Sequence, residues 1–285
     1  MNNVFIPDEN ELEKKLNFFV LEGADSIHVV SDFDRTLTYA TFGNQKTPSL
    51  ISHLRNGNYL TSDYAERAQK LADKYHPIEI NSNISIDEKK KDMSEWWKSH
   101  YELLAECGLD EETMKKAVRD LVKEGRFRLR KGTRDFFGSL HEEKIPLIIM
   151  SSAGIGNMVT DFLDIHGLYC SNVHFIGNTL DFDSKGKFRG IEDNKIIHSF
   201  NKNEIEIKGL PVYDEISKRR NVLLLGDSLG DLKMAEGFPY KNLLKIGFFN
   251  PGEEDFEHYA DQFDVLIKND GDFSYVNFLL KNILR

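Results

Sequence analysis

An apolar run that ends directly in two acids is the feature of this sequence that most restricts its fold and chemistry. Residues 27–31, rich in β-branched side chains, predict a buried strand, and Asp32 and Asp34 follow at its carboxyl end. Ligands of an open α/β sheet bind outside the carboxyl ends of the strands, so both acids are expected at a binding site. A turn or a helix cap is the alternative explanation for an isolated Asp-x-Asp.

The spacing of the two acids suits phosphoryl transfer. A divalent cation that neutralises the first acid, while the second acid moves protons, would make Asp32 a nucleophile and Asp34 a general acid/base. A phosphate dianion approaching Asp32 would be repelled by roughly 4 kcal/mol per unit charge pair at about 4 Å and an effective dielectric of about 20. Attack of Asp32 on a phosphate therefore requires cations at the same site.

Two further apolar runs end in polar residues that suit phosphate and metal. Residues 145–150 stop before Ser152 and an amphipathic helix, and a hydroxyl with free amides at a helix N-terminus outlines an anion site. An ordinary serine N-cap is the alternative there. Residues 222–225 lead into Asp227, a suitable oxygen ligand for Mg²⁺. Asp231 is expected to hold the site together from behind the metal ligands.

A lysine lies between these runs, and the four signals follow one another in a recognisable order. Lys202 could offset the surplus negative charge, although a lone lysine is more often a solvated surface amine. Asp32-x-Asp34, Ser152, Lys202 and the segment 226–231 resemble the four motifs of the haloacid dehalogenase (HAD) superfamily of phosphotransferases. The wider resemblance is to the cytosolic 5′-nucleotidase III family, also called pyrimidine 5′-nucleotidases. It runs from Ile27 to the C-terminus and includes residues 93–100, 152–156, 181–183 and 200–203.

The resemblance implies roles for the residues that would handle the phosphoryl group. Asp32 would be the phosphorylated nucleophile and Asp34 the acid/base. Ser152, the adjoining Ala153 and Lys202 would bind the phosphate. The chemistry needs no cysteine and no Ser-His-Asp arrangement.

The resemblance also implies a metal and a nucleoside site. Mg²⁺ would be held by Asp32, Asp227 and the backbone carbonyl of Asp34. Glu95 matches a glutamate of the family's cap that contacts the nucleoside, and Trp96 beside it is a candidate for stacking on the base. Two tryptophans that only pack inside a helical bundle are the alternative explanation for Trp96 and Trp97.

The predicted organisation is an α/β fold with one insertion. A HAD-like Rossmannoid three-layer core is expected over residues 1–45 and 125–285, and a helical cap over 46–124, inserted after the first catalytic motif. Within the cap, Ser85-Ile86-Asp87-Glu88 resembles a capping box, and apolar residues continue at helical spacing. Residues 181–191 predict a β-hairpin. A cap in this position could close over a substrate.

Composition limits the partners. The chain has 285 residues and a formal net charge of −10, which argues against nonspecific binding to nucleic acid. Its two cysteines offer no disulfide framework and favour a reducing compartment. No signal core and no membrane-length apolar run are evident, so cytoplasm is the expected location, with no membrane partner. A monomer is the default expectation.

These observations predict a Mg²⁺-dependent 5′-nucleotidase that hydrolyses nucleoside 5′-monophosphates, with pyrimidine nucleotides favoured, through an aspartyl-phosphate intermediate. A HAD phosphatase of another small metabolite, such as a sugar phosphate or phosphoserine, is the first alternative. A signalling domain phosphorylated on aspartate is the second. The insertion and a chain about twice the length of such a signalling domain argue against the second alternative.

Overall fold

The structure is a computed structural model that describes residues 3–81, 83–191, 196–202, 212–236 and 240–285. Its centre is a seven-stranded sheet in the order β1-β11-β10-β9-β2-β5-β6, with β1 antiparallel to β11 and the other neighbours parallel. The strands are β1 (Val4–Phe5), β2 (Ile27–Asp32), β5 (Leu147–Ile155), β6 (Val173–Asn178), β9 (Asn221–Gly226), β10 (Asn242–Phe249) and β11 (Val265–Lys268).

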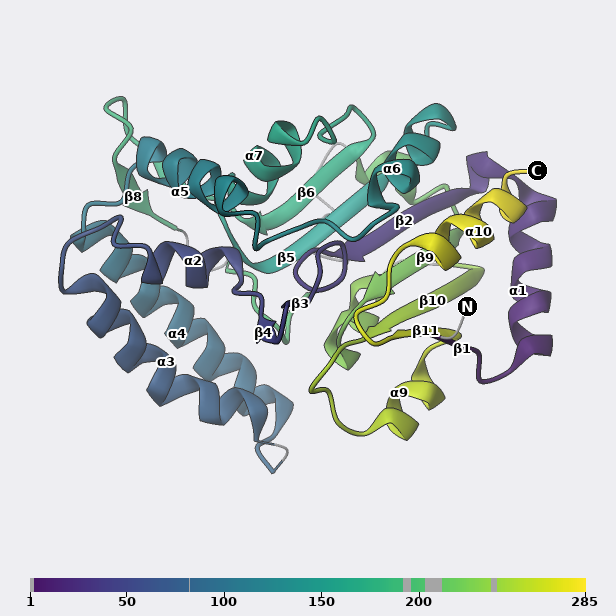
Figure 1. Cartoon of the computed structure of the whole chain (residues 1–285), viewed down its shortest axis with the longest axis horizontal. Coiled ribbons are helices and arrows are strands. Elements are labelled where there is room, and N and C mark those ends of the chain that lie inside the picture. Colours follow the sequence, from purple (N-terminus) through teal and green to yellow (C-terminus); the bar gives the residue numbers. More distant parts are fainter. Residues whose placement is uncertain (1–2, 82, 192–195, 203–211, 237–239) are drawn as a thin grey trace.

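Helices cover both faces of this sheet, which gives a core of three layers (Figure 1). Successive strand residues point to opposite faces. Val29 and Leu223 pack in one apolar cluster with α1, α6, α7 and α10, whereas Val30 and Leu224 pack in a second with α8 and η4. The helices are α1 (Glu9–Glu22), α6 (Thr133–Glu142), α7 (Met158–Ile165), α8 (Tyr213–Ile216), α9 (Phe256–Gln262), α10 (Ser274–Ile283) and the 3-10 turns η1 (Ala24–Ser26) and η4 (Leu229–Ala235). The predicted three-layer α/β core is confirmed.

The order of the strands brings the predicted motifs to one edge of the sheet. β2 lies between β9 and β5, and the three strands run parallel. Ser31 is paired with Leu225 of β9, and Asp32 is paired with Met150 of β5. The loops that carry the polar motifs therefore leave three adjacent strands at the same level.

Four helices occupy the chain between β2 and α6. They are α2 (Leu50–Asn56), α3 (Tyr64–Ile80), α4 (Ile86–Glu106) and α5 (Glu111–Glu124). α3 and α4 lie side by side, away from the sheet (Figure 1). The predicted capping box is present at the start of α4, where Ser85 and Glu88 cap each other's backbone amides. α2 and α3 were not individually predicted, and the domain division at residues 46 and 124 stays a prediction.

Two short hairpins complete the fold: β3 (Thr41–Phe42) with β4 (Gln45–Lys46), and β7 (Asp181–Phe182) with β8 (Phe188–Gly190). The second is the hairpin predicted over 181–191. Its turn is held by the Asp183 carboxylate, which accepts hydrogen bonds from the backbone amides of Lys185 and Lys187, and Gly186 supplies a left-handed conformation with φ of 74°.

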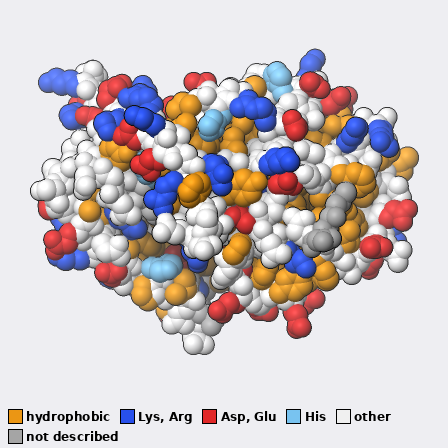
Figure 2. Space-filling model, viewed as in Figure 1, with side chains coloured by type: hydrophobic (Ala, Val, Ile, Leu, Met, Phe, Trp, Pro, Cys, Tyr) orange, Lys and Arg blue, Asp and Glu red, His pale blue; other side chains and the backbone are white. Residues whose placement is uncertain are grey.

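Charges of both signs are interspersed on the face of the molecule seen in Figure 2. Of the helices in the described ranges, none combines the length and the apolar character needed to cross a membrane.

Candidate active site

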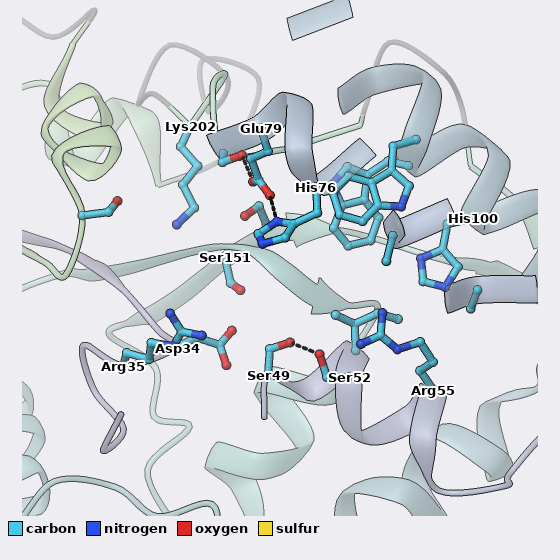
Figure 3. Close-up of a pocket in the computed structure, with 18 of the residues that line it drawn as sticks. Asp34, Arg35, Ser49, Ser52, Arg55, His76, Glu79, His100, Ser151 and Lys202 are labelled. Carbon is cyan, nitrogen blue, oxygen red and sulfur yellow. Dashed lines mark hydrogen bonds and ion pairs between the residues drawn. The ribbon is translucent and has the colours of Figure 1, made fainter. Parts of the chain in front are cut away.

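One cavity of about 680 Å³ collects the predicted catalytic residues (Figure 3). It lies at the carboxyl ends of β2, β5 and β9, and its opposite wall comes from α2, α3 and α4. The predicted residues along it are Asp32, Asp34, Trp96, Ser152, Lys202, Asp227 and Asp231. The structure therefore brings together residues that are as much as 199 positions apart, from Asp32 to Asp231.

Lys202 links the first and last acidic motifs. Its ammonium donates to the Asp32 carboxylate and, at 3.1 Å, to Oδ1 of Asp231. Burial alone would lower the pKa of Lys202, but the charges of Asp231 and Asp32 raise it above its usual value. Lys202 is buried and carries a positive charge, unlike the solvated amine that a lone lysine suggests.

Asp231 holds the loop after β9 in place. Its Oδ2 accepts hydrogen bonds from the backbone amides of Asp227 (3.2 Å) and Ser228 (3.0 Å) and from the Ser228 hydroxyl (2.9 Å). The approach is so close that a Cβ at Gly226 would lie 2.6 Å from that of Asp231. Glycine is therefore required at position 226, and both oxygens of Asp231 are engaged within the protein.

The acids form a site with an excess of negative charge. One carboxylate oxygen from each of Asp32, Asp227 and Asp231 lies within 4.8 Å of the others. Burial raises the pKa of Asp32 and of Asp227, and repulsion from the neighbouring acids adds to both shifts. Among the described residues, only Lys202 forms ion pairs with this cluster, through Asp32 and Asp231, so one positive charge faces three acids. Hard carboxylate oxygens and uncompensated charge fit a divalent cation such as Mg²⁺.

Asp34 differs from Asp32 and Asp231 because it forms no ion pair with a described residue. Both of its carboxylate oxygens are buried, and no described residue satisfies them with a hydrogen bond of ordinary geometry. Burial raises the pKa of Asp34 to about 6, while the charges of Lys202 and Arg35 and the Ser151 hydroxyl act in the opposite direction. A carboxyl group with a pKa near neutrality can both give and take a proton under physiological conditions.

Two hydroxyls, not one, reach the cavity from β5, and both lie within the strand and not at the predicted helix N-terminus, because α7 begins only at Met158. Ser151 and Ser152 both line it, and Figure 3 shows Ser151 directed toward Asp34. The sequence pattern predicts Ser152 as the phosphate ligand and does not indicate Ser151. The side chain of Ala153, also predicted at the phosphate, lies outside the described part of the chain.

The helical wall differs from the prediction at one residue. Glu95 does not line the cavity: its side chain is 53% exposed and accepts from the Tyr75 hydroxyl and from Lys74. Adjacent residues of a helix point about 100° apart, so the cavity takes Trp96 and leaves Glu95 on another face of α4. This position gives no support to a contact between Glu95 and the nucleoside, which stays a prediction from the family resemblance.

Glu79 of α3, like Asp73 of the same helix, is a carboxylate that does line the helical wall. Its Oε1 accepts from the Ser199 hydroxyl at 2.7 Å, and its Oε2 lies 3.2 Å from Nδ1 of His76 (Figure 3). Ser199 belongs to the segment that also carries Lys202, so this contact joins α3 to the catalytic end. No local sequence pattern marks Glu79, which lies in the last turn of a polar helix.

Both tryptophans line the cavity and both are stacked on other rings. Trp96 lies against Tyr75 with ring centroids 5.9 Å apart, and Trp97 lies against Tyr101 at 5.5 Å. His100 is buried and pairs with the Tyr64 hydroxyl at 2.9 Å, as expected of a packed histidine. The aromatic rings of the helical wall therefore line the same cavity as the acids at the sheet end.

A buried arginine braces the loop that follows Asp34. Arg130 is 1% exposed, and its guanidinium group makes five hydrogen bonds of 2.5–2.9 Å, the full capacity of its N–H donors. The acceptors are the backbone carbonyls of Arg35, Thr36 and Gly271 and the side chains of Asn250 and Asp270. Arg35 has a left-handed φ of 61°, so the loop needs such support.

Replacing Arg130 with methionine is expected to destabilise the protein by about 3–5 kcal/mol, because Asp270 and three carbonyls lose a buried cationic partner. Urea unfolding monitored by circular dichroism measures this change. Arg134→Met, which removes an exposed hydrogen bond to the carbonyl of His166 just after α7, is the matched control. It should change the free energy of unfolding by about 0.5 kcal/mol or less. Equal effects of the two changes would contradict the bracing role.

Comparison with known proteins agrees with this geometry. The sequence profile of the pyrimidine 5′-nucleotidase (UMPH-1) family matches residues 35–284. The chain is 35% identical over 264 residues to a mouse 7-methylguanosine phosphate-specific 5′-nucleotidase, covering 92% of this chain and 86% of that protein. A Drosophila melanogaster protein of the same name is 33% identical over 267 residues, covering 92% and 82%.

Solved structures give the same relationship. The crystal structure of cytosolic 5′-nucleotidase IIIB bound to cytidine superposes with a TM-score of 0.89 and 31% identity, over 99% of this chain and 94% of that one. A HAD family hydrolase from Salmonella enterica serovar Typhi, at 12% identity and a TM-score of 0.56 over 95% of this chain and 80% of that one, shares the fold. With its HAD-like core and one continuous match over most of its length, this chain belongs to the pyrimidine 5′-nucleotidase family, whose named members are phosphoric monoester hydrolases.

Proposed function

We propose that this protein is a Mg²⁺-dependent 5′-nucleotidase that hydrolyses nucleoside 5′-monophosphates, pyrimidine ones in particular, to a nucleoside and phosphate. The observation that carries the proposal is a cavity that has acids and Lys202 at one end and aromatic and polar side chains at the other. Such a cavity suits a ligand with a phosphate at one end and a flat base at the other. The named relatives support the class of reaction.

The metal and its ligands are part of the proposal. The carboxylates of Asp32 and Asp227 and the backbone carbonyl of Asp34 would hold Mg²⁺, which neutralises charge as a phosphate dianion enters. Asp231 has both oxygens engaged by Lys202 and the loop after β9, so it positions these groups. Lys202, the Ser152 hydroxyl and the backbone at Ala153 would bind the phosphate oxygens.

The proton and phosphoryl steps fall to the first two acids. Asp32 attacks phosphorus and becomes an aspartyl-phosphate, while Asp34 protonates the departing 5′-oxygen of the nucleoside. Asp34, now ionised, takes a proton from the water that hydrolyses the aspartyl-phosphate. Its raised pKa and its unpaired oxygens support both roles.

Residues 46–124 act as a cap over this site in the proposal, with 1–45 and 125–285 as the core. Contacts between this cap and the segment 196–202 would change if the cap moved, among them Ser199 with Glu79 of α3 and His198 with Ser94 of α4 at 3.2 Å. A closed cap excludes water other than the one used in hydrolysis. The proposed location is the cytosol, in keeping with a Caenorhabditis elegans relative named putative cytosolic 5′-nucleotidase 3.

A phosphate-release screen tests the proposal. Uridine, cytidine, adenosine and guanosine 5′-monophosphates, ribose 5-phosphate and phosphoserine are compared with Mg²⁺ and with EDTA. We expect kcat/KM for pyrimidine nucleotides to exceed that for the sugar phosphate and phosphoserine by at least about tenfold, and EDTA to abolish release reversibly. Preference for ribose 5-phosphate or phosphoserine would favour the metabolite phosphatase. A stable phosphoprotein without turnover would favour the signalling domain.

Glu79→Gln tests the nucleoside end of the cavity. Loss of the charge should lower kcat/KM for uridine 5′-monophosphate by about 10–100-fold, the scale of one hydrogen bond to a charged group, with a smaller loss on p-nitrophenyl phosphate. Steady-state kinetics with both substrates gives the comparison. The matched control is Glu95→Gln, which removes a charge from the neighbouring helix outside the cavity and should change either value less than about twofold. A larger loss of kcat/KM for uridine 5′-monophosphate from Glu95→Gln than from Glu79→Gln would instead assign the nucleoside contact to Glu95.

A further inference from the structure

The helical wall of the cavity carries a cation that none of the steps above uses. Arg55 lies in the last turn of α2 and lines the cavity, and Figure 3 shows its side chain extending into it beside Ser52 and below His100. Its Nε is buried and has no hydrogen-bond partner among the described residues. An arginine near the C-terminus of a helix can simply stabilise that end, but this does not require a desolvated, unsatisfied nitrogen.

The groups around Arg55 do not neutralise its charge. The charge of Arg55 acts on the pKa values of Tyr64 and His100. Burial lowers the pKa of His100 to about 4, and Arg55 acts in the same direction, so this histidine is neutral. Asp73 and Glu79, the acids that α3 contributes to the cavity, form no ion pair with Arg55. The Arg55 guanidinium group therefore lines the cavity with an unpartnered Nε and with no ion pair to a described residue.

The position of Arg55 relates it to the base. The phosphoryl chemistry lies at the sheet end, with Asp34 and Lys202, whereas Arg55 lies on the helical side with His76 and His100 (Figure 3). Guanidinium donors pair with carbonyl oxygens, and their charge repels a cation. Neutral pyrimidine bases carry carbonyl oxygens at the ring edge, whereas the 7-methylguanine ring is positively charged. The named relatives in mouse and Drosophila are described as specific for the latter.

We propose that Arg55 is a specificity-determining residue that donates to a carbonyl oxygen of a neutral pyrimidine base and disfavours 7-methylguanosine 5′-monophosphate. The proposal rests on the 5′-nucleotidase function proposed above. According to this proposal, one charge on α2 gives this chain a substrate preference different from the substrate in the names of the mouse and Drosophila relatives. Glu79, on α3 of the same helical wall, would supply an acceptor for a base N–H group, so the two residues would recognise opposite hydrogen-bonding groups.

The test compares two substrates in matched variants. The ratio of kcat/KM for uridine 5′-monophosphate to that for 7-methylguanosine 5′-monophosphate is measured in the wild type, Arg55→Gln and Arg55→Glu. We expect the wild-type ratio to exceed about ten. Arg55→Gln, which keeps a donor without the charge, should lower it by about tenfold, and Arg55→Glu by about a hundredfold. The change should lie mainly in KM, because Arg55 touches no reacting atom.

The control is Arg119→Glu, an equal reversal of charge on α5 at a side chain that is 57% exposed and outside the cavity lining. It should leave the ratio within about twofold. A wild-type ratio below one, or a ratio that Arg55→Glu and Arg119→Glu change equally, would overturn the role of Arg55. Absence of turnover with both nucleotides would instead refute the 5′-nucleotidase function. Melting temperatures of all variants show whether each is folded.

Discussion

Asp32→Asn is expected to reduce nucleotide hydrolysis to the background rate, the largest effect of any single change in this protein. The amide has nearly the shape of the carboxylate, but it does not attack phosphorus and it is a poor ligand for Mg²⁺. The measurement is steady-state phosphate release, together with mass spectrometry of acid-quenched enzyme. Wild type should gain one phosphoryl group during turnover, and the variant should gain none.

The fold should survive this change because Lys202 keeps its contact with Asp231 at 3.1 Å. Removing one buried carboxylate also relieves repulsion within the acidic cluster, whose members have raised pKa values. The melting temperature is therefore expected to stay within a few degrees of wild type. The matched control is Asp135→Asn, on the first turn of α6 and outside the cavity lining, which should retain wild-type activity. Activity of Asp32→Asn within tenfold of wild type would rule out a covalent mechanism.

Asp34→Asn is expected to lower kcat by about 10²–10⁴-fold, the range of general acid–base catalysis, while the Mg²⁺ concentration for half-maximal rate stays the same. The reason is that only the backbone carbonyl of Asp34 is assigned to the metal. Its carboxylate oxygens make no ordinary hydrogen bond to described residues, so their loss should not disturb the site. The measurement is kcat as a function of Mg²⁺ concentration.

Asp227→Asn gives the contrasting result. Its carboxylate is assigned to the metal, so the variant should need more Mg²⁺ and should recover much of its rate when Mg²⁺ is in excess. A second contrast uses p-nitrophenyl phosphate, whose leaving group departs without protonation. For Asp34→Asn, the presteady-state rate of enzyme phosphorylation should fall less, relative to wild type, with this substrate than with a nucleotide. If Asp34→Asn needed more Mg²⁺ and Asp227→Asn did not, the assignments of the two residues would have to be reversed.

Local patterns were sufficient for the parts of the fold that depend on residues near in sequence. Apolar runs that stop at Asp32, Ser152 and Asp227 indicated parallel strands with a site at their carboxyl ends, and these side chains line one cavity. The capping box at Ser85 and the hairpin over 181–191 were also found where predicted. Each of these features is fixed by periodicity, capping or turn chemistry within about ten residues.

The helical wall could not be predicted in the same way. Glu95 follows the family pattern and stands next to Trp96, yet one step of about 100° along α4 takes it out of the cavity. Glu79 and Arg55 line the cavity because α2 and α3 are packed in particular rotations, which no local pattern specifies. The sequence contained these residues but no signal that distinguished them from other charged residues on polar helices.

The sequence by itself determined which chemistry is present: two acids after a strand, a hydroxyl, a lysine and a third acid, in an order that requires parallel strands. The tertiary structure decided which side chains meet. Lys202 is 170 residues from Asp32, and Arg130 is 140 residues from Asp270, yet each pair is in direct contact. Such contacts depend on strand order, register and helix rotation, which result from the burial of the whole apolar core.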